Sequence, residues 1–167
     1  MVTAQSMPNL RGLLTAFLGR APYPGPIHWL LLPIALAAIF LTARLWRPLI
    51  DAGFPGLALG YCLALPVAIL TSYYAYTYDM TLLVVPLLLL GGALIDRPNF
   101  ALIPQTSVLR TTIPRRMIAC GLLLLICTPL YWALILRLDC PYLLAIPMFI
   151  LALGIAAAMR LDPAPIP

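Results

Sequence analysis

The residues best suited to chemistry gather in one short stretch, residues 71–79, which holds four tyrosines, a serine, two threonines and one aspartate. A carboxylate can act as a general base on a substrate hydroxyl or accept a hydrogen bond from it. Tyrosine rings can stack on sugar rings, and tyrosine and serine hydroxyls can donate or accept hydrogen bonds. The candidate binding residues of this stretch are Ser72, Tyr74, Tyr76, Tyr78 and Asp79.

Each of these residues also has a structural interpretation, and the sequence leaves both open. Asp79 stands directly before an apolar run, where its carboxylate can accept hydrogen bonds from the free N–H groups of a first helical turn. Tyrosines gather at the interface between hydrocarbon and water in membrane proteins. Asp79 is therefore a helix cap, a substrate-binding residue or a catalytic base. The tyrosines form either an interfacial belt or a sugar-binding surface.

Other kinds of site find little support in the sequence. His28 is the only histidine, so one chain cannot supply a multi-histidine metal site or two histidine ligands to a haem. The four cysteines form no Cys-x-x-Cys pair, and we expect them to be small core hydrophobes. No glycine-rich phosphate loop is present, and we expect neither a metal nor a cofactor.

The elements that position these residues are predicted to be apolar helices. Of the 167 residues, 63% are hydrophobic and 9% are charged, against about 25% charged in a soluble domain. Ten arginines and five aspartates cannot cover a water-soluble surface, which excludes a soluble enzyme, a nucleic-acid-binding module and a disordered chain. The composition predicts an all-α, polytopic membrane helix bundle in a single membrane domain, residues 1–167.

Long runs without charge mark the predicted spans. A helix needs about 20 residues to cross about 30 Å of hydrocarbon. The sequence predicts about five transmembrane helices, at residues 28–44, 54–71, 80–95, 117–136 and 140–159. Asp51, Asp79 and Asp139 precede three of these spans and are predicted caps. Gly56 and Gly60 have the GxxxG spacing of closely packed membrane helices, and the pair Gly91-Gly92 suggests the same.

Residues 8–19 differ from the spans. Apolar residues recur there with helical spacing, at Leu10, Leu13, Leu14, Phe17 and Leu18. The polar residues Asn9, Arg11 and Thr15 fall on other sides of the helix. This pattern predicts a short amphipathic helix that lies in the membrane interface and carries Arg11.

The arginines predict the orientation. Seven of them fall in alternate segments: Arg44, Arg47, Arg97, Arg110, Arg115, Arg116 and Arg160. The positive-inside rule places those segments in the cytoplasm of a multi-pass plasma-membrane protein, with the N-terminus and residues 71–79 outside. An N-terminus with two arginines and no signal sequence does not readily cross a membrane, so we expect further spans to precede residue 1.

Two stretches resemble a known enzyme family. Residues 6–14, Ser-Met-Pro-Asn-Leu-Arg-Gly-Leu-Leu, are similar to a segment midway through the membrane glycosyltransferases of family 87, which belong to the GT-C superfamily. Residues 70–83, followed by Pro86, resemble a later motif of that family. In that motif a serine-rich and aromatic-rich outer loop leads through a Tyr-Asp or His-His pair into a Leu/Pro-rich span.

The resemblance implies a polyprenyl-phosphate-linked sugar donor and hexosyl transfer on the extracytoplasmic face. It implies that the chain is the C-terminal portion, a fragment or split subunit that lacks the catalytic acid of the first outer loop and needs an N-terminal half. Arg11 would then contact the polyprenyl phosphate, since guanidinium groups suit phosphate oxygens, or would anchor the helix to lipid headgroups. Whether the chain is itself an enzyme stays open.

Two other functions compete with this one. A small non-catalytic scaffold or assembly protein is the main alternative, because no complete catalytic set occurs in the sequence. A transporter component is the third, and it is weakened because no charge lies in the middle of a predicted span. All three have membrane lipid as a partner, and none binds nucleic acid.

Overall fold

The computed structural model describes residues 7–18, 26–50, 54–72, 74, 77–95, 112–127, 129–130 and 133–161. Every element within these ranges is helical, and they contain no strand. The all-α fold class predicted from composition is confirmed.

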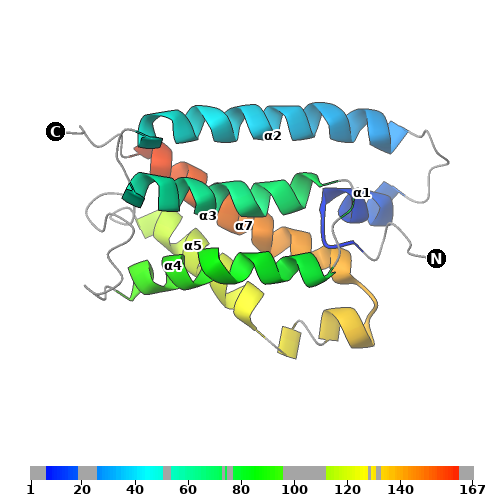
Figure 1. Cartoon of the computed structure of the whole chain (residues 1–167). Helices are drawn as coiled ribbons and strands as arrows, with labels where there is room; N and C mark the ends of the chain where they lie inside the picture. Colours follow the sequence, from blue (N-terminus) through cyan, green and yellow to red (C-terminus); the bar gives the residue numbers. More distant parts are fainter. Residues whose placement is uncertain are drawn as a thin grey trace.

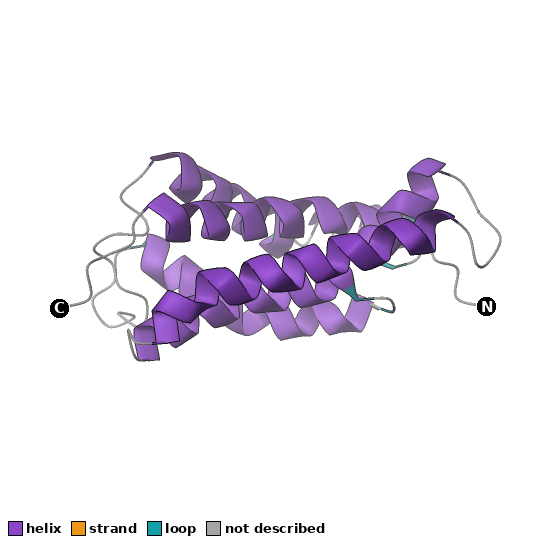
Figure 2. Ribbon diagram, turned by 90° about the horizontal axis from the view of Figure 1, so that it is seen from above, coloured by secondary structure: helices purple, strands orange, loops and turns teal. Residues whose placement is uncertain are grey.

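The described residues form long helices joined by tighter turns. The α-helices are α1 (Leu10–Leu18), α2 (Pro26–Ile50), α3 (Phe54–Thr71), α4 (Val84–Leu94), α5 (Thr112–Ile126) and α7 (Ala145–Leu161). Between them lie the 3-10 turns η2 (Thr77–Leu83) and η5 (Pro141–Leu144) and the π-turn η4 (Ala133–Arg137). The long helices run roughly along one axis, and α1 lies at one end beside the start of α2 (Figure 1). The view from above shows the same elongated arrangement (Figure 2).

The helix bounds differ from the predicted spans in an informative way. α3 covers the predicted residues 54–71, whereas α2 continues to Ile50, past the expected end at residue 44. The predicted helix 117–136 is interrupted, because α5 ends at Ile126 and Pro129 follows. A proline has no N–H to donate and its ring clashes with the preceding turn, so the chain resumes as the separate turn η4.

The N-cap positions that the sequence assigned to Asp79 and Asp139 are held by other residues. The cap residue of α4 is Leu83, which makes no side-chain cap bond, and Asp79 lies instead in the first turn of η2. The cap residue of η5 is Cys140, and Asp139 before it has a φ of 50°. In both places a 3-10 turn precedes the α-helix and moves its start beyond the aspartate. Asp51 lies outside the described residues.

The core lies mainly between α3, α4, α5 and α7. The pair α5 and α7 makes the most extensive helix contact, and Ile118, Leu151 and Ile155 are fully enclosed there. A second buried cluster, near η2 and η5, is centred on Leu144 and Met148. The expectation that the cysteines are core residues is correct for Cys62 alone. Cys120 and Cys127 are exposed, and Cys140 is half-buried.

Within the described ranges, two helices are long and apolar enough to cross a membrane, Trp29–Pro48 and Pro141–Arg160. The shorter apolar helices Gly56–Thr71 and Asp79–Leu94 lie between them in sequence. The C-terminal ends of α2 and α7 and the start of α5 lie at the same end of the molecule (Figure 1). That end carries five described arginines: Arg44, Arg47, Arg115, Arg116 and Arg160.

Candidate functional site

The short helix α1 is fastened to the bundle by the side chain of Asn9, which is fully buried. Its Oδ1 atom accepts a hydrogen bond from the N–H of Gly12 at 2.8 Å, which caps the free first turn of α1. Its Nδ2 atom donates to the carbonyl oxygen of Ser72 at 2.8 Å. One side chain therefore starts the helix and ties it to a segment 63 residues away.

The same contact brings Arg11 over Tyr74. The guanidinium carbon of Arg11 lies 5.3 Å from the centroid of the Tyr74 ring, within the range of a cation–π interaction. The hydroxyl of Ser72 donates to the carbonyl oxygen of Tyr74 at 2.9 Å, which shapes the turn that presents this ring. Stacking orients the guanidinium of Arg11 and leaves its positive charge in place. Arg11, Ser72 and Tyr74 therefore form one cluster, which we call the α1 cluster.

The other predicted binding residues are placed less completely. Asp79 is half-buried in the first turn of η2, an element that packs against both α3 and α4. Tyr78 belongs to η2 by its backbone, but its side chain lies outside the described residues, as does all of Tyr76. Asp139 is exposed just before η5, which contacts α1. Two aspartates therefore belong to the elements at the end of the bundle that carries α1.

Sequence reasoning singled out Arg11, Ser72 and Tyr74 but missed Asn9, which joins them. An asparagine just before an apolar helical run is a capping signal, so the bond to Gly12 was open to prediction. The bond to Ser72 was not, because nothing in the local sequence shows which distant carbonyl oxygen faces the amide.

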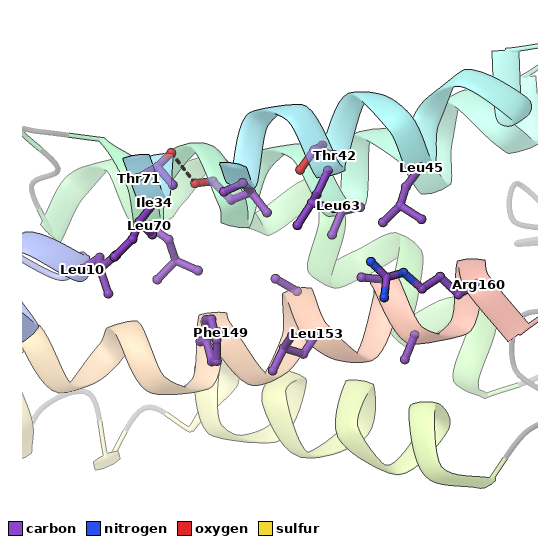
Figure 3. Close-up of a pocket in the computed structure, with 16 residues that line it drawn as sticks. Leu10, Ile34, Thr42, Leu45, Leu63, Leu70, Thr71, Phe149, Leu153 and Arg160 are labelled. Atoms are coloured by element: carbon purple, nitrogen blue, oxygen red, sulfur yellow. Dashed lines mark hydrogen bonds between the residues drawn. The ribbon is translucent and has the colours of Figure 1, made fainter. Parts of the chain in front are cut away.

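A second feature is an apolar groove between α2, α3 and α7, with a cavity volume of about 500 Å³ (Figure 3). Leu10 and Thr71 line the groove near the α1 end, and Arg160 lines the far end. The hydroxyl of Thr71 donates to the carbonyl oxygen of Val67 at 2.8 Å, so its one donor proton is used within α3. The groove is therefore apolar along most of its length and charged at one end.

The groove exists because α2 packs mainly on α3 and touches α7 only slightly. The face of α7 toward the groove is a stripe at helical spacing: Phe149, Ala152, Leu153, Ala156, Ala157 and Arg160. The three alanines in this stripe leave space that larger side chains would fill. Such a space, apolar and within the range of 300–1,000 Å³, is typical of small-molecule sites.

Within the described residues, no group of three histidine, cysteine or acidic side chains is placed to hold a metal ion. No protein-family model, curated protein or solved structure matches this chain. The site is therefore defined by its own geometry, namely the α1 cluster at one end of the bundle and the groove that runs from α1 to Arg160.

Proposed function

We propose that this chain is a multi-pass membrane protein whose α1 end faces outside. Large apolar side chains cover its surface, and only 6% of the apolar segment Trp29–Pro48 of α2 is buried. An exposed apolar surface of this extent is unfavourable in water and is favourable against lipid tails. The five arginines at the opposite end support a cytoplasmic position for that end, by the positive-inside rule.

The function we propose is binding of a polyprenyl-phosphate-linked sugar at the α1 cluster, as the C-terminal part of a family 87-like hexosyltransferase. The observation that carries this proposal is the contact between α1 and the Ser72–Tyr74 turn. Those two segments carry the family resemblance, and the hydrogen bond from Asn9 to Ser72 joins them. Two stretches that bind one ligand have to lie close together in space. These two stretches do lie close together.

Arg11, Tyr74 and Asp79 would each contact a different part of the lipid-linked sugar. Arg11 pairs with the phosphate, because a guanidinium makes strong charge-assisted hydrogen bonds to phosphate oxygens. Tyr74, whose ring is 59% exposed, offers a face and a hydroxyl to the sugar. Asp79 accepts a hydrogen bond from the sugar or the acceptor. The general base of the transfer reaction comes from another segment, as the resemblance implies, so this part binds the donor without completing the reaction.

Photolabelling tests this proposal. The full chain is placed in phosphatidylcholine nanodiscs with a polyprenyl phosphate that carries a benzophenone, and labelled peptides are identified by mass spectrometry. We expect labels in α1 and in residues 72–83. Arg11→Gln should lower labelling about tenfold, the value of one charge-assisted hydrogen bond. The matched control is Arg44→Gln, which removes the same charge at the other end and should leave labelling unchanged.

Two further variants sharpen the test. Asn9→Asp keeps an oxygen that caps α1 but removes the donor to Ser72, so labelling should fall by less than in Arg11→Gln. Ala75→Cys should react in intact cells with an impermeant thiol reagent, whereas Gln105→Cys should not. Labelling that does not depend on Arg11 contradicts the donor site, and the reverse thiol pattern contradicts the orientation.

A non-catalytic scaffold is the second candidate, and the exposed face of α2 favours it. Trp29, Leu36 and Phe40 are all more than half exposed along this helix. A helix so little covered can pack against spans of another chain. Co-purification of a defined partner that is lost on Phe40→Glu, together with unchanged polyprenyl phosphate labelling, would support this role.

A further inference from the structure

The groove between α2, α3 and α7 has a feature that the proposed donor site does not use. Arg160 is the one charged side chain among the residues that line it, and it continues the apolar stripe of α7. Figure 3 shows its guanidinium turned toward the groove. No hydrogen bond or ion pair from Arg160 to another described residue accounts for this position. Arg160 therefore places a positive charge at one end of an otherwise apolar groove, the end that we call its mouth.

The α7 side of the groove is about as long as one leaflet of a bilayer is thick. From Phe149 to Arg160 the lining stripe of α7 rises about 16 Å, at about 1.5 Å per residue. This is about half of the roughly 30 Å hydrocarbon thickness. The groove continues past Phe149 to Leu10 and Thr71, so it suits the tail of a lipid whose headgroup lies at the Arg160 end and whose chain extends toward α1.

The charge around the mouth of the groove selects the headgroup. Arg44 and Arg47 lie in the last turns of α2, at the same end of the molecule as Arg160 (Figure 1). Both of these arginines are exposed. Basic pockets between membrane helices on the cytoplasmic side bind anionic lipid headgroups. A zwitterionic lipid would gain less here, because its own cation opposes the arginines.

We propose that this groove binds one acyl chain of an anionic phospholipid of the cytoplasmic leaflet, with the phosphate paired to Arg160. Small side chains at Ala38, Ala152 and Ala156 make room for the chain. The lipid fills the gap between α2 and α7, helices that touch only slightly. This assignment rests on the membrane orientation given under the proposed function and does not depend on sugar transfer.

The donor lipid is a poorer occupant of the groove. Its phosphate belongs at the α1 cluster, at the opposite end of the bundle from Arg160. A polyprenyl chain that entered from that end would place hydrocarbon against the guanidinium of Arg160. Burial of a cation against hydrocarbon without an anion is unfavourable.

Native mass spectrometry of the full chain tests this proposal. The protein, purified in detergent, is incubated with phosphatidylglycerol or phosphatidylcholine of identical acyl chains. We expect one retained phosphatidylglycerol per chain and a preference of about tenfold over phosphatidylcholine, the value of a charge-assisted hydrogen bond. Arg160→Gln should abolish this preference. Arg116→Gln, which removes an arginine at the same end but outside the groove, should preserve it.

A second pair of variants tests the groove itself. Ala157→Phe fills the groove and should reduce retention of both lipids, whereas Ala43→Phe on the exposed side of α2 should not. Equal retention of the two lipids, or a preference that survives Arg160→Gln, overturns the proposal. Displacement of phosphatidylglycerol by polyprenyl phosphate, one for one, overturns it as well. Loss of Arg11-dependent photolabelling would leave the phosphatidylglycerol preference unaffected. The donor-site proposal and the phospholipid proposal can therefore be contradicted independently.

Discussion

The α5–α7 pair and helix α2 show opposite ways of using an apolar helix. At the α5–α7 contact the backbones approach so closely that a Cβ on Gly121 would lie 2.9 Å from Leu151 Cβ and 3.1 Å from Leu151 Cα. Gly154 faces Ile118 with the same closeness, at 3.0 Å. α2 instead leaves most of its surface uncovered and borders a groove. Apolar helices therefore form the core in one place and border a groove in another.

The close contact of α2 with Gly60 of α3 leaves one polar group unsatisfied. The indole of Trp46 packs against Gly60 of α3, where a Cβ would lie 2.6 Å from the Trp46 Nε1 atom. That N–H is buried and has no hydrogen-bond partner within the described part of the chain. A buried, unpaired donor costs about 1–3 kcal/mol. At this point α2 is therefore attached by side-chain packing without a hydrogen bond from the indole. Its attachment is weaker than that of α7.

The largest effect is expected from Gly121→Val, which breaks the tight pair. The new side chain meets the backbone of Leu151, so α7 has to move, and we expect a loss of about 3 kcal/mol in the free energy of unfolding. Denaturation in mixed micelles followed by circular dichroism measures it. Gly91→Val is the matched control, because a Cβ on Gly91 would meet nothing within 4 Å. Equal losses in both variants would contradict the close approach.

A smaller effect is expected from Gly60→Ala, which disturbs the attachment of α2. The added methyl forces the Trp46 indole aside, and since a side chain can move more easily than a backbone, we expect a loss of about 1 kcal/mol. In a Trp46→Ala background the same change should cost almost nothing. That difference, taken from a double-mutant cycle, measures the coupling of the two residues. Additive losses would show that the contact has no energetic weight.

The smallest effect is expected from Phe40→Ala on the uncovered face of α2. Phe40 is 66% exposed, and lipid or detergent tails replace its contacts, so the free energy of unfolding should change by less than about 0.5 kcal/mol. Leu151→Ala, at a fully buried position on α7, is the comparison and should cost about 2–3 kcal/mol. A large loss at Phe40 would mean that α2 packs against another surface in the purified protein.

The sequence predicted only some of the close helix contacts made at glycines. The spacing of Gly56 and Gly60 predicted a close helix contact, and Gly60 does face an aromatic ring. The pair Gly91-Gly92 predicted another, yet a Cβ on Gly91 would have open space around it. The close approach of two backbones uses Gly121 and Gly154, single glycines on two different helices, which no spacing within one helix could reveal.

The sequence by itself determined the all-α class, the bounds of α3 and the amphipathic helix α1, because hydrophobic periodicity and proline chemistry act within a few residues. It also identified Arg11, Ser72 and Tyr74 as candidate binding residues. Only the tertiary structure decided that Asn9 bonds to Ser72, that Leu83 and not Asp79 is the N-cap residue of α4, and that Arg160 lines a groove. These outcomes depend on which faces of distant helices meet, and that choice is made by packing across the whole molecule.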